Sequence, residues 1–117
     1  MIAKTFIMHT NLDYLKGITE NNNDMIRELI AIFKDQVAEM SQQLRDALAK
    51  QEWEQLSKLA HKAKSTVAVV GMADMAAELK NLELWAHERK NIENYGKIVE
   101  KFIFVTNEAL VELKEYL

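Results

Sequence analysis

The sequence predicts an all-α protein, an up-down-up-down bundle of four helices with a short extra helix at its N-terminus. The 117 residues contain no proline and only three glycines, so little in the chain interrupts a helix. Apolar residues make up 49% of the chain and recur at helical spacing over long stretches. Because short connections join these stretches, successive helices should lie antiparallel to each other. We expect one domain over residues 1–117.

The first two helices are predicted from a turn signal and from apolar spacing. We expect residues 1–10 to be loosely ordered and a short helix to cover residues 11–17. The run Asn21–Asp24 is typical of a turn and supplies an N-cap to a long helix over about residues 24–50. The apolar positions of this long helix are predicted to face the core: Met25, Leu29, Ile32, Phe33, Val37, Met40, Leu44 and Leu48.

Three further helices should complete the bundle, over about residues 52–70, 73–90 and 92–116. Gly71 should end the first of these or mark a close approach of the backbone. The inward positions of the last two helices are again those at helical spacing: Met75, Leu79, Leu82 and Trp85 or Ala86, then Tyr95, Ile98, Val99, Phe102, Val105, Leu110 and Leu113.

An α+β fold is the alternative to this all-α prediction. Residues 5–8, 66–70 and 102–105 are rich in β-branched and aromatic side chains, which favour strands. Two of these segments lie inside strongly periodic helical stretches, and none is followed by a hairpin signal. The helical interpretation is therefore the stronger one.

Composition and charge exclude several classes of function. The chain has no cysteine, which excludes disulfides, thiolate catalysis and cysteine metal sites. No apolar run approaches the roughly 18 residues of a membrane span, and residues 1–8 are too short and wrongly flanked for a signal peptide. The net charge is −3 without a concentrated basic stripe, which argues against binding of nucleic acid. We expect a cytoplasmic protein.

Motifs for nucleotide and metal binding are also missing. No glycine-rich phosphate loop is present, so we expect no ATP site of that type. No Glu-x-x-His pair that would build a di-iron centre in a bundle is found. Glu83 and His87 are four residues apart and can share a helix face, but two ligands do not make a metal site. We interpret His87 as a solvated helix residue and assign no role to His9.

His61 is the candidate reactive residue. The helix over residues 52–70 has one apolar stripe: Trp53, Leu56, Leu59, Ala60, Ala63, Val67 and Val70. His61 lies well away from the centre of this stripe, with the small residues Ser57, Ser65 and Ala68 on neighbouring turns. Such neighbours leave the ring accessible to a large partner. An exposed histidine more often has no function, so the charges around it are decisive.

The charges around His61 suit an anionic group. Residues 55–73 contain no aspartate or glutamate, whereas Lys58, Lys62 and Lys64 lie close to His61. A local cationic field in an acidic protein suits a phosphoryl group. The commoner explanation of such lysines is that they solvate the surface of a helix. At neutral pH much of the imidazole is unprotonated, which makes the ring a nucleophile.

The chain resembles the histidine phosphotransfer (HPt) domain family of phosphorelay signalling proteins. The resemblance rests on Ala60-His61, on Lys64 three residues later and on Gly71 ten residues after the histidine. Further matches are Phe33, the pair Glu52-Trp53 and the pair Leu82-Glu83. The resemblance covers the chain from about residue 12 onward. Ser65 stands where the family usually has glycine, but serine is small enough to preserve access for a partner.

This resemblance implies a phosphorelay intermediate. His61 would accept a phosphoryl group from an aspartyl phosphate on a receiver domain and pass it to an aspartate of another receiver. Lys64 would offset the charge of the phosphoryl group, and Glu83 would orient the ring. A partner that reaches His61 should also cover Ser57, Ser65 and Ala68, with Val69 at the edge of the contact.

The same resemblance implies the partners and the source of the metal. The receiver would supply the aspartate and the divalent metal, Mg²⁺, so this chain would have no cofactor of its own. A hybrid sensor histidine kinase would be a further partner, and the chain would be a monomer. An alternative is a helical adaptor or dimerisation module that has lost phosphotransfer. The retention of His61 and Lys64 argues against this alternative.

Overall fold

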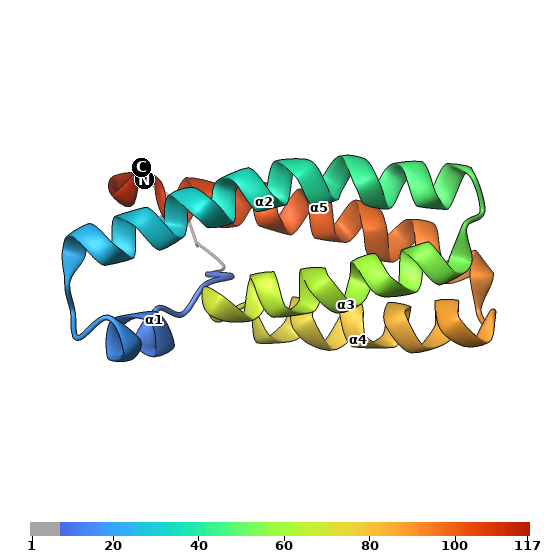
Figure 1. Ribbon diagram of the computed structural model, residues 1–117, viewed down its shortest axis with the longest axis horizontal. Helices are drawn as coiled ribbons and strands as arrows, with labels where there is room; N and C mark the ends of the chain where they lie inside the picture. The colour runs from blue at the N-terminus through green and yellow to red at the C-terminus, as the bar shows by residue number, and fades with distance from the viewer. Residues whose placement is uncertain (1–7) are drawn as a thin grey trace, which may run out of the picture.

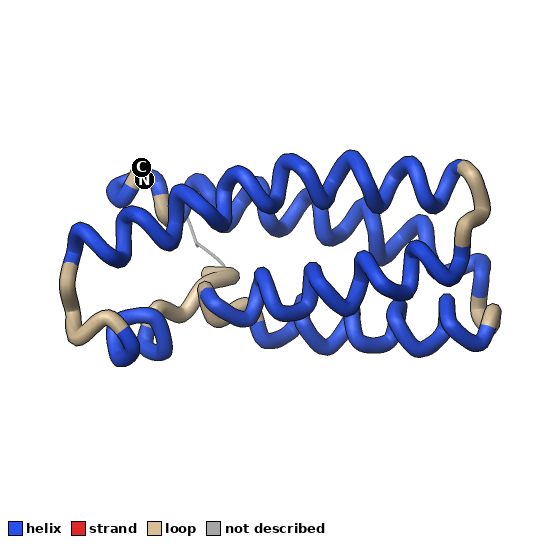
Figure 2. The backbone as a smooth tube through the Cα atoms, viewed as in Figure 1, coloured by secondary structure: helices blue, strands red, loops and turns tan. Residues whose placement is uncertain are grey.

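The computed structural model describes residues 8–117, and every regular element in this range is helical (Figure 2). The elements are α1 (Asp13–Ile18), α2 (Asn23–Ala49), α3 (Trp53–Val69), α4 (Ala73–Glu88), η1 (Ile92–Asn94), α5 (Tyr95–Glu112) and η2 (Lys114–Tyr116). The α+β alternative is wrong for residues 66–70, in α3 and its C-cap, and for residues 102–105, in α5. The third segment of that alternative, residues 5–8, lies mostly outside the described part of the chain.

The four long helices form the predicted up-down-up-down bundle (Figure 1). α3 packs against both α2 and α4, and α5 packs against both α4 and α2, so that each long helix has two neighbours. The predicted boundaries agree with the observed ones within two residues, except that two short 3-10 helices flank α5. None of the helices within residues 8–117 is both long and apolar enough to cross a membrane.

The predicted apolar stripes form the core with two exceptions. Met25 and Ile32 were expected to face inward, but they are 46% and 47% exposed. α2 has 27 residues and α3 has 17, so the N-terminal part of α2 extends past the end of α3 (Figure 1). Met25 and Ile32 each lie one residue before a buried position, Ile26 and Phe33, so both fall beside the series of buried residues that repeats in steps of three and four along α2. In α4, Ala86 rather than Trp85 is fully buried.

The start of α2 is capped as the sequence predicts. The Asn22 side chain accepts a hydrogen bond from the Met25 backbone N–H at 3.1 Å. This bond satisfies one of the N–H groups that a helix leaves unpaired in its first turn. The asparagine cluster therefore ends the connection from α1 and starts the longest helix.

Gly71 both ends α3 and allows a close approach of the backbone, so both interpretations of this glycine are confirmed. Its φ of +74° lies in the left-handed region, which glycine adopts without strain. The Asn11 N–H donates to the Val70 carbonyl at 2.9 Å, which brings residues 8–12, here called the N-terminal strap, against the α3–α4 turn. A Cβ at position 71 would lie 2.1 Å from the Asn11 carbonyl oxygen.

Glu112 of α5 holds the other end of the strap. Its carboxylate accepts hydrogen bonds from the backbone N–H groups of His9 and Thr10 and from the Thr10 hydroxyl, at 2.9–3.1 Å. His9 Nε2 also lies 2.8 Å from a carboxylate oxygen of Glu108. We expected residues 1–10 to be loosely ordered; residues 1–7 lie outside the described part of the chain, whereas His9 and Thr10 are anchored.

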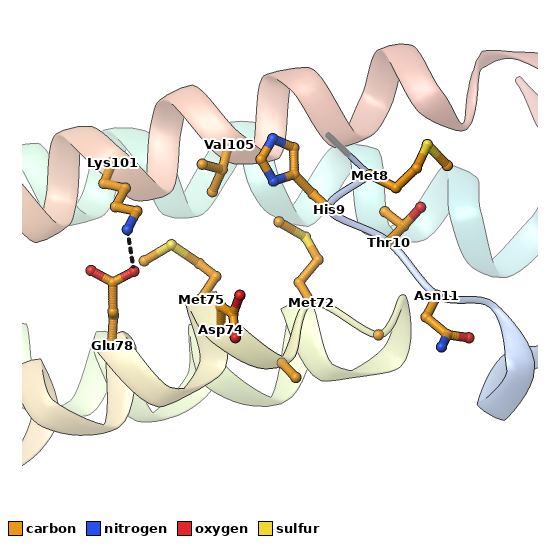
Figure 3. A pocket seen from close by; sticks show the side chains of 12 residues that line it. Met8, His9, Thr10, Asn11, Met72, Asp74, Met75, Glu78, Lys101 and Val105 are labelled. Carbon is orange, nitrogen blue, oxygen red and sulfur yellow. Dashed lines mark ion pairs between the residues drawn. The ribbon is translucent and has the colours of Figure 1, made fainter. Parts of the chain in front are cut away.

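A groove of about 460 Å³ lies between the strap, α4 and α5 (Figure 3). Its lining includes the buried side chains of Met72 and Met75. Lys101 of α5 and Glu78 of α4 form an ion pair of 2.7 Å on its wall. The groove therefore has an apolar floor, and one of its walls carries an ion pair.

Candidate functional site

α3 presents His61 to solvent, as its helical spacing predicts. The neighbouring Ala60 and the Ala63 two residues further on are fully buried, and they fix the opposite face of the helix against the core. The His61 side chain is 63% exposed. An imidazole in this position is accessible to a large partner.

Glu83 of α4 holds the His61 ring. One carboxylate oxygen lies 2.9 Å from His61 Nδ1. Since a carboxylate accepts hydrogen bonds, Nδ1 is the nitrogen that carries the proton in this pair. The lone pair of the neutral ring is then on Nε2. The predicted contact between Glu83 and the ring is therefore present, and it also selects the tautomer.

The same carboxylate binds Lys64. The Lys64 ammonium donates to the second Glu83 oxygen at 3.2 Å, and its side chain is only 28% exposed. Glu83 thus bridges the imidazole and the cation. Burial alone would raise the pKa of the Glu83 carboxyl, but the hydrogen bonds and charges of His61 and Lys64 outweigh it and lower the pKa. The bridging carboxylate is consequently ionised at neutral pH.

Ser57 is not an exposed contact residue, which corrects the sequence prediction. It is only 6% exposed, and its hydroxyl donates to the Glu83 backbone carbonyl at 2.7 Å. Ser57 lies on the flank of α3 that packs against α4, where a small side chain lets the two helices approach closely. It therefore positions the backbone from which the Glu83 carboxylate reaches His61.

The His61–Glu83 pair lies in an open groove of about 410 Å³ between α3 and α4. The groove is lined by residues of both helices: Glu54, Ser57, Lys58, His61, Glu83, Leu84 and His87. A second cross-helix pair is present in it, with His87 Nδ1 3.0 Å from a Glu54 carboxylate oxygen. The sequence pattern does not single out Glu54, although this residue is seven positions before His61 and so lies on the same face of α3.

The other proposed contact residues differ in their exposure. Ser65 and Ala68 are exposed as predicted, whereas Val69 is half-buried and packs against the core. Val69 is one turn beyond Thr66, whose hydroxyl lies 3.5 Å from the Gln36 amide of α2. Ile32 is one turn before Gln36, and the two helices are antiparallel, so Ile32 and Val69 lie at the same level of the bundle.

This arrangement places apolar surface of α2 beside the C-terminal part of α3, since Ile32 is 47% exposed. The signal that could have placed Ile32 outside the core is its spacing, because the buried positions Ile30 and Phe33 belong to a series of three- and four-residue steps that leaves Ile32 out. Among residues 8–117, no group of three or more histidine or carboxylate side chains is arranged to hold a metal ion.

The chain matches a model of a known protein family. The model of the Hpt domain matches residues 28–117, a range that contains all of α3, α4 and α5 and most of α2. His61, Lys64 and Glu83 all lie within the matched range. Comparisons with curated proteins and with solved structures found no match.

Proposed function

Because the chain belongs to the Hpt domain family, whose members interact with receiver domains and kinases in phosphorelays, we propose that it is a phosphorelay intermediate. His61 accepts a phosphoryl group from a receiver aspartyl phosphate and passes it to an aspartate of another receiver. The observation that supports this most directly is the Glu83 carboxylate, which bonds both His61 and Lys64 while the ring stays exposed.

The tautomer supports a transfer step that needs no proton movement. The Nε2 lone pair of His61 attacks the phosphorus atom and forms the N–P bond, while the bond from phosphorus to the aspartyl oxygen breaks. The aspartate leaves as a carboxylate, and the proton stays on Nδ1 beside Glu83. The phosphorylated ring is then cationic, and the ionised carboxylate stabilises it. In the reverse transfer, the ring leaves as neutral imidazole.

Lys64 balances the charge of the phosphoryl group. In the unphosphorylated protein its ammonium is bound by Glu83, one helical turn from His61. A lysine side chain is flexible, so its ammonium can move towards a phosphoryl group on Nε2. Phosphoryl transfer depends mainly on positioning and charge stabilisation. Lys64 is therefore a charge-stabilising residue, and the receiver contributes the divalent metal, Mg²⁺, and the aspartate.

The docking face surrounds His61 on α3 and continues onto α2. Ser65 and Ala68 provide small exposed side chains, which allow a close approach. Ile32 and Val69 provide apolar surface at the level of the α3 C-terminus. The proposed partners are response-regulator receivers and a hybrid sensor kinase, and the chain acts as a cytoplasmic monomer.

The alternative of a helical adaptor that has lost phosphotransfer makes a different prediction. An adaptor requires neither a defined tautomer of His61 nor a cation beside it. The experiment that separates the two functions is incubation of the protein with phosphorylated receiver domains, followed by a test of the label for acid lability, which is typical of phosphohistidine.

The matched variants are His61→Gln, His9→Gln and His87→Gln, which make the same chemical change at each histidine. We expect an acid-labile label on the wild type and on the His9 and His87 variants, and none on His61→Gln. Label that remains on His61→Gln would contradict the assignment of the acceptor. Absence of label on every protein, with a panel of active receivers, would favour the adaptor.

A further inference from the structure

The groove between α3 and α4 contains two histidine–carboxylate pairs of similar construction. In one, His61 of α3 is bound by Glu83 of α4; in the other, His87 of α4 is bound by Glu54 of α3. The exposed fractions of the two histidine side chains are also similar, 63% and 68%. The reaction proposed above uses only the first pair, so the second pair has no role in it.

The Glu54–His87 pair lies within reach of any partner that reaches His61. Glu54 is seven residues before His61, which is about 10 Å along the helix axis. A protein–protein interface of standard size buries about 800 Å² on each partner, which corresponds to a patch with a radius of roughly 16 Å. A receiver centred on His61 therefore covers the second pair as well.

The pair also determines the chemistry that His87 offers. Glu54 accepts the Nδ1 proton, so the neutral ring presents Nε2 to solvent as a hydrogen-bond acceptor. The other charged groups of the groove are Lys58 and Glu83. Since Glu83 is engaged by His61 and Lys64, the groove presents the His87 acceptor and the Lys58 cation to a partner.

We propose that His87, oriented by Glu54, is a recognition residue for the receiver domain and binds a hydrogen-bond donor on its surface. This inference rests on the proposed phosphotransfer function. His87 does not touch the phosphoryl group; it contributes to the affinity of the encounter and to the choice among receivers, because only a receiver with a donor at that position gains the contact. Leu84, 48% exposed in the same groove, contributes apolar contact beside it.

The test is the rate of transfer from a phosphorylated receiver as the concentration of that receiver is varied. We expect His87→Ala to raise the half-saturating concentration by roughly fivefold, the typical effect of one lost hydrogen bond, and to leave the limiting rate unchanged. His87→Gln should recover part of this loss, because the amide oxygen can accept a hydrogen bond. Glu54→Ala should raise the half-saturating concentration as well, because the ring loses the acceptor that orients it.

His9→Ala is the matched control, since His9 is also paired with a glutamate but lies outside the groove. It should transfer like the wild type. An unchanged half-saturating concentration in His87→Ala with every active receiver would overturn the proposal, as would a lowered limiting rate or a His87→Gln variant as weak as His87→Ala. The proposed function fails separately, through phosphoryl acceptance by His61→Gln, so the two failures are distinguishable.

Discussion

The middle and the C-terminal end of α3 are built in different ways. In the middle, the groove is held by side chains: Glu83 binds His61 and Lys64, and these groups are partly or largely exposed. At the end, the junction with the strap is held by the backbone, where Asn11 donates to Val70 and Gly71 leaves no room for a side chain. The same helix thus contains an open polar groove and a closely packed backbone junction.

Folding stability and the proposed phosphotransfer therefore depend on different parts of α3. Exposed ion pairs contribute little to folding, so the groove can change its bonds during the proposed transfer. Close backbone contact leaves no such freedom, because an added atom has nowhere to go. Variants at the junction should therefore change the free energy of unfolding, and variants in the groove should change transfer or binding.

The largest expected effect is at the junction. Gly71→Ala should lower the free energy of unfolding by about 2–4 kcal/mol. Alanine is strained at the left-handed backbone conformation of this position, and its Cβ also clashes with the N-terminal strap. The added Cβ would meet the Asn11 carbonyl oxygen at 2.1 Å. Denaturant unfolding measures this loss, and the protein that remains folded should still accept phosphoryl groups.

Gly96→Ala is the control for this change. A Cβ at position 96 would meet the Leu48 side chain at 3.9 Å, an ordinary contact in α5. The free energy of unfolding should stay the same or rise by up to about 1 kcal/mol. Equal destabilisation by the two alanines would show that the junction is not specially constrained.

The next effect concerns docking on the exposed side of α3. Ser65→Trp and Ala68→Trp should each weaken receiver binding by at least about 1.4 kcal/mol, a tenfold change. Both positions are exposed, so the helical content and the melting temperature should stay nearly unchanged. A binding titration beside a thermal melt measures both quantities.

Ala38→Trp on an exposed position of α2 provides the matched control and should bind the receiver normally. Full-strength binding by both the Ser65 and the Ala68 variants would place the docking face elsewhere. A large loss of stability in either variant would contradict the inference that these exposed positions affect binding and not folding.

A smaller effect, on phosphoryl transfer, is expected when the Lys64 cation is removed. Lys64→Ala should slow transfer or shorten the lifetime of phospho-His61 by an amount equivalent to about 1 kcal/mol, the worth of a partly exposed charge pair. The fold should persist, since the Lys64 ion pair is only partly buried and lies outside the apolar core. Rapid-quench transfer and the decay of the labelled protein are the measurements. Unchanged values for both would show that Lys64 only solvates the helix.

The smallest effect is the contribution of Glu83 to the pH dependence of stability. The folded pKa of Glu83 lies below its ordinary value of 4.5, so the unfolded chain takes up this proton first. The stabilisation is therefore present above pH 4.5 and is lost as the pH falls through the lower, folded pKa. Glu83→Gln should lose less stability than the wild type over this range, by roughly 0.3–0.5 kcal/mol.

Denaturant unfolding at several pH values between neutrality and strong acid measures this difference. Parallel pH profiles for the wild type and Glu83→Gln would show that the bridge between His61 and Lys64 contributes nothing to folding. The transfer assay on the same variant gives an independent result, since the amide can still accept the Nδ1 proton but brings no negative charge to a cationic ring.

Local sequence predicts most of the fold and the exposure of His61, and the family resemblance adds the contact of Glu83 with the ring. The spacing of apolar residues predicts four long helices, Asn22 predicts the start of α2, and Gly71 predicts the turn after α3. These features depend on residues within one or two turns of each other, so they can be derived from the chain alone. The exposure of His61 follows from the same spacing.

Tertiary structure decided which groups meet the reactive ring and which apolar residues stay uncovered. Glu83, Ser57 and Glu54 act across the contact between α3 and α4, and the burial of Ser57 shows that a polar residue beside an apolar stripe can face a neighbouring helix. Met25 and Ile32 are apolar but exposed, because they lie beside the series of buried residues on α2 and not within it. Periodicity defines the face of a helix, whereas packing against the neighbouring helices defines how wide a part of that face is covered.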